Sequence, residues 1–217
     1  MKEITFWFDP LSPFVHLAFH RLPEALAGTS HVVHYRPVLL AALLQHHGQK
    51  GPAEVEPKRA FTFRHVHWLA QHHGIALHTP RRHPFNPLAL LRLALACAPA
   101  GGLPNRWVVE NVLAHVWCSD GENGADAEDP ERLRALAERL QPQRDPASDA
   151  VKAELRAHTD AAREAGVFGV PAFVTDGRLF WGLDSLPMLR DALNDHPWFQ
   201  GPTWEAEGAP REGVRRV

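Results

Sequence analysis

The first forty residues contain short apolar runs and one stretch with helical spacing. Residues 4–8 are aromatic and β-branched, which predicts a buried strand. A short loop ends in Ser12 and Pro13, and apolar positions over 15–26 then follow helical spacing. Residues 32–38 predict a second strand. A strand, a helix and a strand in this order predict a right-handed βαβ unit with parallel strands.

The middle of the chain has mostly the pattern of helices. A loop rich in Gly and Pro is expected over 48–57, and an acidic loop that contains glycine over 121–129. Gly74 ends one helix, and Asn86 caps the start of the next. Apolar spacing predicts helices over 39–44, 58–73, 86–98, 107–117, 130–140 and 147–165.

The pattern changes near the C-terminus. Turn-forming residues fill 166–171, and two short strand-forming runs then flank Asp176-Gly177, which is a strong β-hairpin signal. The predicted strands are residues 172–175 and 178–181. Residues 183–194 predict a closing helix, and the stretch from Pro197 predicts a loosely attached tail.

The order of elements predicts the fold class. A βαβ half, a long helical block and a ββα half indicate an α/β protein in which both halves share one sheet, as in a thioredoxin-like fold with a large inserted helical domain. The expected division is a discontinuous thioredoxin-like domain over 1–45 and 166–196, an inserted helical domain over 46–165, and a C-terminal tail over 197–217.

Composition narrows the classes of function. The 23 basic and 25 acidic residues give a formal charge of −2, so no strong field favours nucleic acid or an anionic membrane. No apolar run is long enough to span a bilayer, and Glu3 and Asp9 interrupt any signal-peptide core, so we expect a cytoplasmic protein. The two cysteines, Cys97 and Cys118, form no C-x-x-C motif, which excludes a disulfide scaffold and a dithiol redox site.

Ser12 is the first candidate for chemistry. It follows the first predicted strand and opens a helix, whose free N–H groups and partial positive charge favour an anionic ligand. A thioredoxin-type redox site would place a reactive cysteine here. The alternative role of Ser12 is that of a helix N-cap, with Pro13 in the first turn.

Two further segments resemble ligand sites. The Val170-Pro171 bond precedes a strand, and a cis form would leave the main chain of Val170 free to pair with a peptide-like ligand. The alternative is an ordinary trans proline at the start of a strand. Asp184, between the hairpin and the last helix, would either hold a ligand ammonium group or cap that helix.

Together these segments resemble DsbA-like thioredoxin-fold proteins. Within that group the sequence is most similar to 2-hydroxychromene-2-carboxylate isomerases and kappa-class glutathione transferases. The residues that carry the resemblance are 6–14, 36–40, 58–59, 83–87, 166–173 and 180–184, and the likeness covers residues 3–195.

The resemblance implies a glutathione site. Ser12 would donate to the glutathione sulfur and favour its thiolate, and would be the catalytic residue. Val170 would pair with the cysteinyl part of glutathione beside a cis Pro171, and Asp184 and Ser185 would hold the γ-glutamyl end. The implied reaction is a cis–trans isomerisation of an aromatic pyruvate by reversible addition of the thiolate. Relatives also suggest a homodimer.

The substrate's carboxylate and keto groups need hydrogen-bond donors. The candidates in loops that would overhang Ser12 are Lys58, Arg59, Arg82, His83 and Asn86. Asn86 matches the family pattern best, although it would serve equally well as a helix cap before Pro87. Many relatives carry Asn in the loop around residues 48–52, where Gln49 or Lys50 stands here. We expect Asn86, Lys58 and Gln49 to contact the substrate.

The fifteen histidines are unusual, and many lie between residues 46 and 83. They show neither the H-E-x-x-H motif nor a Cys/His ligand spacing, so we expect structural or solvent-exposed histidines and no metal site. Two other functions stay open: a kappa-like glutathione transferase or peroxidase acting on electrophiles, and a non-catalytic DsbA-like binding protein.

Overall fold

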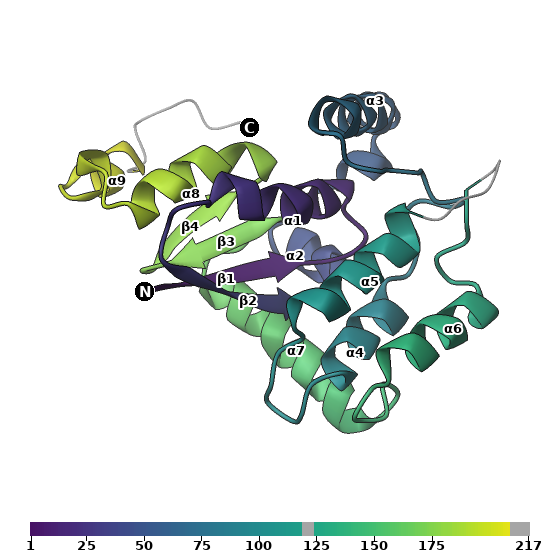
Figure 1. Cartoon of the computed structure of the whole chain (residues 1–217). Helices are drawn as coiled ribbons and strands as arrows, with labels where there is room; N and C mark the ends of the chain where they lie inside the picture. Colours follow the sequence, from purple (N-terminus) through teal and green to yellow (C-terminus); the bar gives the residue numbers. More distant parts are fainter. Residues whose placement is uncertain (119–123, 209–217) are drawn as a thin grey trace.

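The computed structural model describes residues 1–118 and 124–208, so part of the predicted acidic loop lies outside the described residues. The central sheet has the strand order β2-β1-β3-β4 (Figure 1). The strands are β1 (Lys2–Phe8), β2 (His31–Pro37), β3 (Ala172–Thr175) and β4 (Arg178–Trp181). β1 pairs parallel to β2 and antiparallel to β3, and β3 pairs antiparallel to β4. The sheet therefore joins the N-terminal βαβ unit to the C-terminal hairpin, as predicted.

Helices cover both faces of this sheet and extend beyond one end of it. The helices are α1 (Pro13–Ala25), α2 (Leu40–His46), α3 (Glu56–His73), α4 (Leu88–Ala96), α5 (Arg106–Trp117), α6 (Pro130–Leu140), α7 (Asp149–Glu164), α8 (Leu186–Leu193) and α9 (Thr203–Gly208). Over the described residues, the short 3₁₀ helices are η1 (Pro52–Glu54), η2 (Leu183–Ser185) and η3 (Pro197–Phe199). α1 and α8 lie on one face of the sheet and α7 lies on the other (Figure 1). Within the helical block, α4, α5 and α6 pack on one another beside the sheet, while α3 lies apart from them and packs against α1.

Local sequence explains several boundaries. The prediction of the hairpin is confirmed, because Asp176 and Gly177 both adopt positive φ (49° and 73°), as the tightest hairpin turns require. Gly74 ends α3 in the left-handed conformation that glycine adopts without a steric cost. The prediction that Asn86 is the N-cap of the fourth helix is one residue early, because Pro87 occupies the N-cap and α4 begins at Leu88.

A row of aromatic side chains crosses all four strands. In the register of the sheet, Phe6 lies beside both Tyr35 and Phe173, and Phe173 lies beside Phe180. The rings of Phe6 and Phe173 stack with their centroids 4.8 Å apart, and all four residues are buried. Aromatic cross-strand pairs each add to sheet stability, so this row fixes the register in which β1 carries the loop of Ser12.

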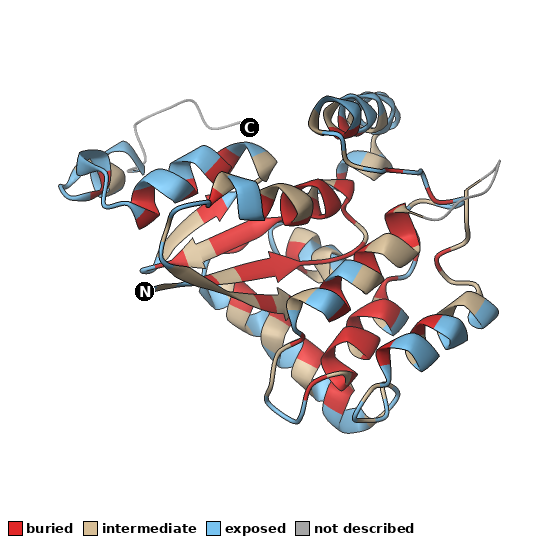
Figure 2. Ribbon diagram, viewed as in Figure 1, coloured by how far each residue is buried: buried red, intermediate tan, exposed pale blue. Residues whose placement is uncertain are grey.

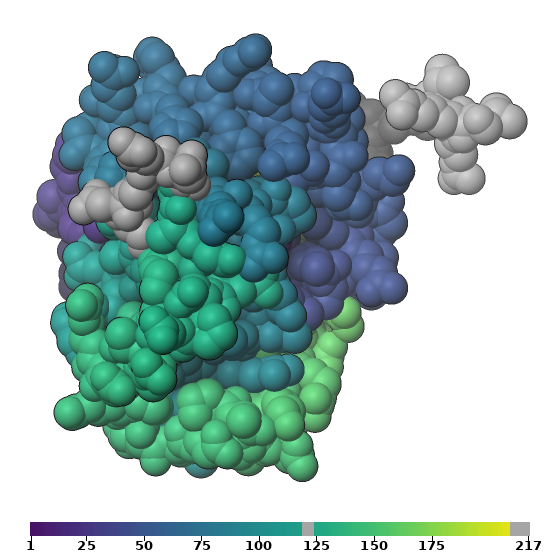
Figure 3. Space-filling view, turned by 90° about the vertical axis from the view of Figure 1, so that its right-hand side faces the viewer, coloured from purple at the N-terminus to yellow at the C-terminus, as the bar shows by residue number. Residues whose placement is uncertain are grey.

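One core connects the sheet and the helical block. The main cluster of buried apolar residues includes Phe6 and Phe173 of the sheet together with Val112 and Trp117 of α5 (Figure 2). On the face that Figure 3 shows, the blue, teal and green residues of the helical region form one continuous surface. The division into a thioredoxin-like domain and an inserted domain stays a prediction, since the two parts pack on shared core residues.

The expectation of a loosely attached tail is wrong for its first part. Phe199 is 3% exposed, and its ring lies 6.0 Å from that of Phe180 and 5.6 Å from that of Trp204. The guanidinium of Arg178 donates to the Phe199 carbonyl at 2.9 Å. The sequence suggested a loop because Gly and Pro are frequent there, but the aromatic residues between them pack on the outer strand β4.

Candidate active site

The loop after β1 is organised by the carboxylate of Asp9. Its Oδ1 accepts a hydrogen bond from the Leu11 N–H and its Oδ2 accepts one from the Leu40 N–H, both at 2.9 Å. Asp9 is completely buried, and this burial raises its pKa to about 7, although the two N–H donors act in the opposite direction. The Ser12 N–H closes the loop onto the Asp9 carbonyl at 3.1 Å. Asp9 therefore joins the loop to the start of α2.

Two side chains from the helical block hold the carbonyls of the same loop. The indole Nε1 of Trp117 donates to the Pro10 carbonyl, and Nε2 of His83 donates to the Leu11 carbonyl, each at 2.9 Å. Burial lowers the pKa of His83, as does repulsion from the Arg59 guanidinium, while the bond to Leu11 acts in the opposite direction. A neutral His83 keeps the single N–H that this bond needs.

Ser12 occupies the N-cap position of α1, but its side chain caps no N–H of the helix. The hydroxyl donates instead to the Val170 carbonyl at 3.4 Å, a long hydrogen bond to a residue 158 positions away. The Val170-Pro171 bond is cis, the form that the resemblance implied. Within the described residues, the Val170 N–H donates to no other group. The Val170 N–H thus lacks a partner among the described residues, although its carbonyl accepts from the Ser12 hydroxyl.

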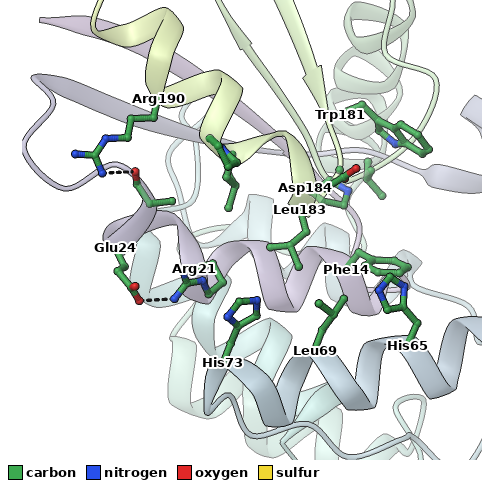
Figure 4. A pocket seen from close by; sticks show the side chains of 16 residues that line it. Phe14, Arg21, Glu24, His65, Leu69, His73, Trp181, Leu183, Asp184 and Arg190 are labelled. Carbon is green, nitrogen blue, oxygen red and sulfur yellow. Dashed lines mark hydrogen bonds and ion pairs between the residues drawn. The ribbon is translucent and has the colours of Figure 1, made fainter.

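A cavity of about 720 Å³ lies beside Val170, between α1, α3 and α8. We call it the α8 cavity; Val170, Pro171, Trp181 and Asp184 line one part of it. Figure 4 shows Trp181, Asp184 and Phe14 near one end and Arg21, Glu24 and Arg190 near the other. The cavity therefore has the Asp184 carboxylate at one end and a set of charged side chains at the other.

Asp184 lies on a turn that glycine makes possible. Gly182 has a φ of 92°, and the Oδ1 atom of Asp184 occupies the space that a Cβ at position 182 would need. Within the described residues, no N–H or ammonium group is paired with the Asp184 carboxylate. Ser185 is buried, and its hydroxyl donates to the Gly182 carbonyl at 2.9 Å. Asp184 thus faces the cavity, while Ser185 holds the turn from behind.

A second cavity, of about 640 Å³, lies on the other side of Phe14. We call it the α2 cavity; it lies between the Ser12 loop, α2, η1 and α3. Its walls are largely apolar, with Leu40, Leu44 and Phe63 among them. Ser12 lines this cavity, and Phe14 lines both cavities. Ser12 and Phe14 therefore stand at the boundary between two adjoining spaces.

The structure brings together only some of the predicted substrate contacts. Gln49, Arg59 and His83 line the α2 cavity, and so does Glu54, which the sequence did not single out. Lys58, Lys50, Arg82 and Asn86 line neither cavity.

Asn86 and Arg82 are engaged elsewhere. Oδ1 of Asn86 accepts a hydrogen bond from the Leu88 N–H at 3.1 Å, which favours its role at the start of α4 over a role in binding. Arg82 pairs with Asp126 at 2.5 Å. Lys58 is exposed and adjacent to Arg59 in α3, and successive residues of a helix point about 100° apart. Only Arg59 of this pair faces the cavity.

Comparison with known proteins shows which family this chain belongs to. The model of the DsbA-like thioredoxin domain matches residues 3–194, which is most of the chain. The chain belongs to the DsbA-like thioredoxin family. This confirms the predicted thioredoxin-like fold and agrees with the observed sheet.

Several named proteins are similar to this DsbA-like chain in sequence or in structure. A 2-hydroxychromene-2-carboxylate isomerase of Sphingobium xenophagum is 29% identical over 89% of this chain and 99% of the relative. A solved structure of a 2-hydroxychromene-2-carboxylate isomerase superposes with a TM-score of 0.74 at 26% identity, over 96% of this chain and 100% of the other. Human glutathione S-transferase kappa 1 is 23% identical over 89% of this chain and 92% of the relative. The similarity noted from the sequence is thereby confirmed.

This DsbA-like chain has no cysteine among the described residues that line the two cavities. Cys97 follows α4, where burial raises the pKa of its thiol to about 11, and Cys118 follows α5. Ser12 occupies the position at the start of α1. Any thiol that acts beside Ser12 must therefore come from a bound molecule.

Some of the many histidines have structural roles. Nε2 of His16 donates to the Ala76 carbonyl at 2.8 Å, and burial lowers the pKa of His16 to about 4. His83 and His115 donate in the same way to the carbonyls of Leu11 and Ala127. In the described parts of the chain, no three His, Cys, Asp or Glu side chains are close enough to hold a metal ion, and no helix has the length and apolarity to cross a membrane.

Proposed function

We propose that this protein is a glutathione-dependent cis–trans isomerase of the 2-hydroxychromene-2-carboxylate type, acting on aromatic pyruvates or chromene carboxylates. The observation that carries the proposal is the place of Ser12: its hydroxyl touches Val170 of the α8 cavity and itself lines the α2 cavity. A thiol held at this boundary would belong to a ligand in one cavity and would reach a substrate in the other.

The α8 cavity offers groups that suit glutathione. The Val170 N–H and carbonyl can pair with the main chain of the cysteinyl residue, in the manner of an added β-strand. The Asp184 carboxylate can bind the ammonium group at the γ-glutamyl end, and Ser185 supports the turn that carries Asp184. A peptide-like ligand with an ammonium end would complete the hydrogen bonds that Val170 and Asp184 lack within the described part of the protein.

Ser12 would favour the thiolate form of the bound thiol. A free cysteine thiol has a pKa near 8.5, and lowering it by about two units requires ~2.7 kcal/mol of preferential stabilisation of the thiolate. The Ser12 hydroxyl can rotate from the Val170 carbonyl, which it reaches only over 3.4 Å, to a nearby sulfur. The N-terminus of α1 adds a favourable partial positive charge.

Glutathione, when bound, would supply a thiolate for reversible addition to the conjugated double bond, whose own electron pair would shift to the keto oxygen and return when the thiolate leaves. The residues of this chain position the reactants. Ser12 orients the sulfur, and Phe14 separates the two ligands except at the point of reaction. The apolar walls of the α2 cavity exclude water from the aromatic part of the substrate. Asp9, Trp117 and His83 hold the Ser12 loop in place.

The test is the Ser12→Ala variant, compared with Ser30→Ala at an exposed serine outside both cavities. Turnover of a hydroxychromene carboxylate is followed by absorbance, and glutathione binding by calorimetry. We expect kcat to fall about 100-fold in Ser12→Ala, the usual effect of removing one donor to a developing anion, and to stay unchanged in Ser30→Ala. Turnover without glutathione, or full activity of Ser12→Ala, would refute the proposal.

A kappa-like glutathione transferase is the second candidate, because the similarity to human glutathione S-transferase kappa 1 covers 89% of the chain. This activity would use the same α8 cavity and Ser12, with an electrophile in the α2 cavity. One experiment distinguishes the two candidate activities: the protein is given glutathione with either a chromene carboxylate or 1-chloro-2,4-dinitrobenzene. Isomerised substrate with no conjugate supports the first, and a stable conjugate supports the second.

A further inference from the structure

Arg59 presents the only cationic side chain that the described residues contribute to the lining of the α2 cavity, apart from the titratable His83. Its Nη2 donates to the His83 carbonyl at 2.9 Å. A guanidinium has five N–H donors, so this bond anchors the side chain and leaves most of its donors free. In the described part of the chain, no carboxylate pairs with Arg59 within ion-pair distance.

The anchoring of Arg59 links it to the reaction centre. Arg59 holds the His83 carbonyl, the His83 ring holds the Leu11 carbonyl, and Leu11 precedes Ser12. Two hydrogen bonds and the Leu11-Ser12 peptide bond thus connect the Arg59 guanidinium to Ser12. The distance between the Arg59 guanidinium and a reacting atom held at Ser12 is therefore set by the protein, as binding in a reactive geometry requires.

The other charged side chain that lines the cavity is Glu54. Its Oε1 accepts a hydrogen bond from the Gly51 N–H at 2.6 Å, which holds it on the η1 side of the cavity. An anionic group of a substrate is repelled by Glu54 and attracted by Arg59. The two charges therefore favour one orientation of an elongated, singly charged aromatic ligand.

We infer that Arg59 is the residue that selects the substrate's carboxylate, and that the α2 cavity takes aromatic monocarboxylates in preference to their uncharged analogues. The inference deepens the proposed function and rests on it for the reaction, but not for the binding preference. A guanidinium binds a carboxylate through two parallel N–H···O bonds, which fixes the direction of the aromatic group as well as its charge. The volume of about 640 Å³ is ample for a one- or two-ring aromatic acid.

The experiment compares cinnamate with cinnamamide, which have the same shape and differ in charge, by calorimetry without glutathione. The variants are Arg59→Ala and Arg59→Lys, with Arg64→Ala as the control, since Arg64 is an exposed arginine of α3 outside the cavity. We expect the unaltered protein and Arg64→Ala to prefer cinnamate about threefold, because Arg59 is exposed and solvent weakens an exposed ion pair. Arg59→Ala should lose the preference, and Arg59→Lys should keep part of it.

Two results would overturn the inference: a cinnamate preference that survives in Arg59→Ala, or no cinnamate binding to the unaltered protein. Thermal unfolding of each variant shows whether the His83 segment is still folded, and Arg59→Lys keeps the test valid if Arg59→Ala is unfolded. Glutathione binding is measured in parallel. A protein that does not bind glutathione refutes the proposed function, whereas glutathione binding without an Arg59-dependent cinnamate preference refutes only the role of Arg59.

Discussion

The indole Nε1 of Trp117 donates a hydrogen bond to the Pro10 carbonyl at 2.9 Å, across 107 positions of sequence. Trp117 is fully buried at the end of α5, and Pro10 lies in the loop that carries Ser12. This bond connects the helical block to the candidate active site. The loop is thus positioned by tertiary contacts as well as by its own turns.

Replacing Trp117 with Phe should weaken both the fold and the activity. The change removes a buried donor, leaves the Pro10 carbonyl without it and opens a small void, which together should lower the free energy of unfolding by roughly 2–4 kcal/mol. Urea unfolding measures this loss. The control is Trp107→Phe, because Trp107 is 50% exposed at the start of α5. Equal losses in the two variants would contradict the role of Trp117.

Asp9 should make the stability of the protein depend on pH. Its pKa in the folded state is raised to about 7 from an ordinary value near 3.8, so between these pH values the folded protein binds more protons than the unfolded chain. The contribution of Asp9 to the free energy of unfolding therefore falls as pH rises from about 4 to 7, by on the order of 4 kcal/mol at most. Urea unfolding at several pH values measures the free energy of unfolding of the unaltered protein minus that of Asp9→Asn. This difference should decrease as pH rises over this range, and an increase would contradict the sign.

Asp184→Asn should weaken the binding of glutathione about tenfold and leave stability nearly unchanged. The reason is that the carboxylate faces the α8 cavity without a partner among the described residues, so its charge is available to an ammonium group. Calorimetry with glutathione measures the effect. Asp191→Asn is the matched control, since Asp191 is an exposed carboxylate of α8 that lines neither cavity. A comparable loss in Asp191→Asn would show that the effect comes only from net charge.

Gly182→Ala should reduce glutathione affinity through the position of Asp184. A Cβ at residue 182 would lie 2.4 Å from Asp184 Oδ1, which forces the carboxylate to move. Gly177→Ala is the control for backbone strain, because Gly177 also has positive φ but a Cβ there would meet no atom within 4 Å. Both variants should lose about 1 kcal/mol of stability, and only Gly182→Ala should lose affinity. Unchanged glutathione binding in Gly182→Ala would show that the position of Asp184 does not affect the affinity for glutathione.

Sequence alone determined the elements whose signals are local. The hairpin of β3 and β4 was predicted with its boundaries, because Asp176 and Gly177 can adopt the positive φ angles that the turn needs. The start of α1 was predicted in the same way from Ser12 and Pro13. The sequence also shows serine and not cysteine at position 12, which implies that a thiol acting there is supplied by a ligand.

Tertiary structure decided which of the candidate side chains meet. Lys58 and Arg59 have similar sequence signals, but the phase of α3 against the Ser12 loop turns only Arg59 toward the α2 cavity. Asn86 was equally suited to binding and to capping, and the position of Leu88 assigned it to the helix start. The Trp117–Pro10 bond joins residues far apart in the chain and has no local signal. Local turns depend on the backbone preferences of a few adjacent residues, whereas a cavity exists only where distant elements pack together.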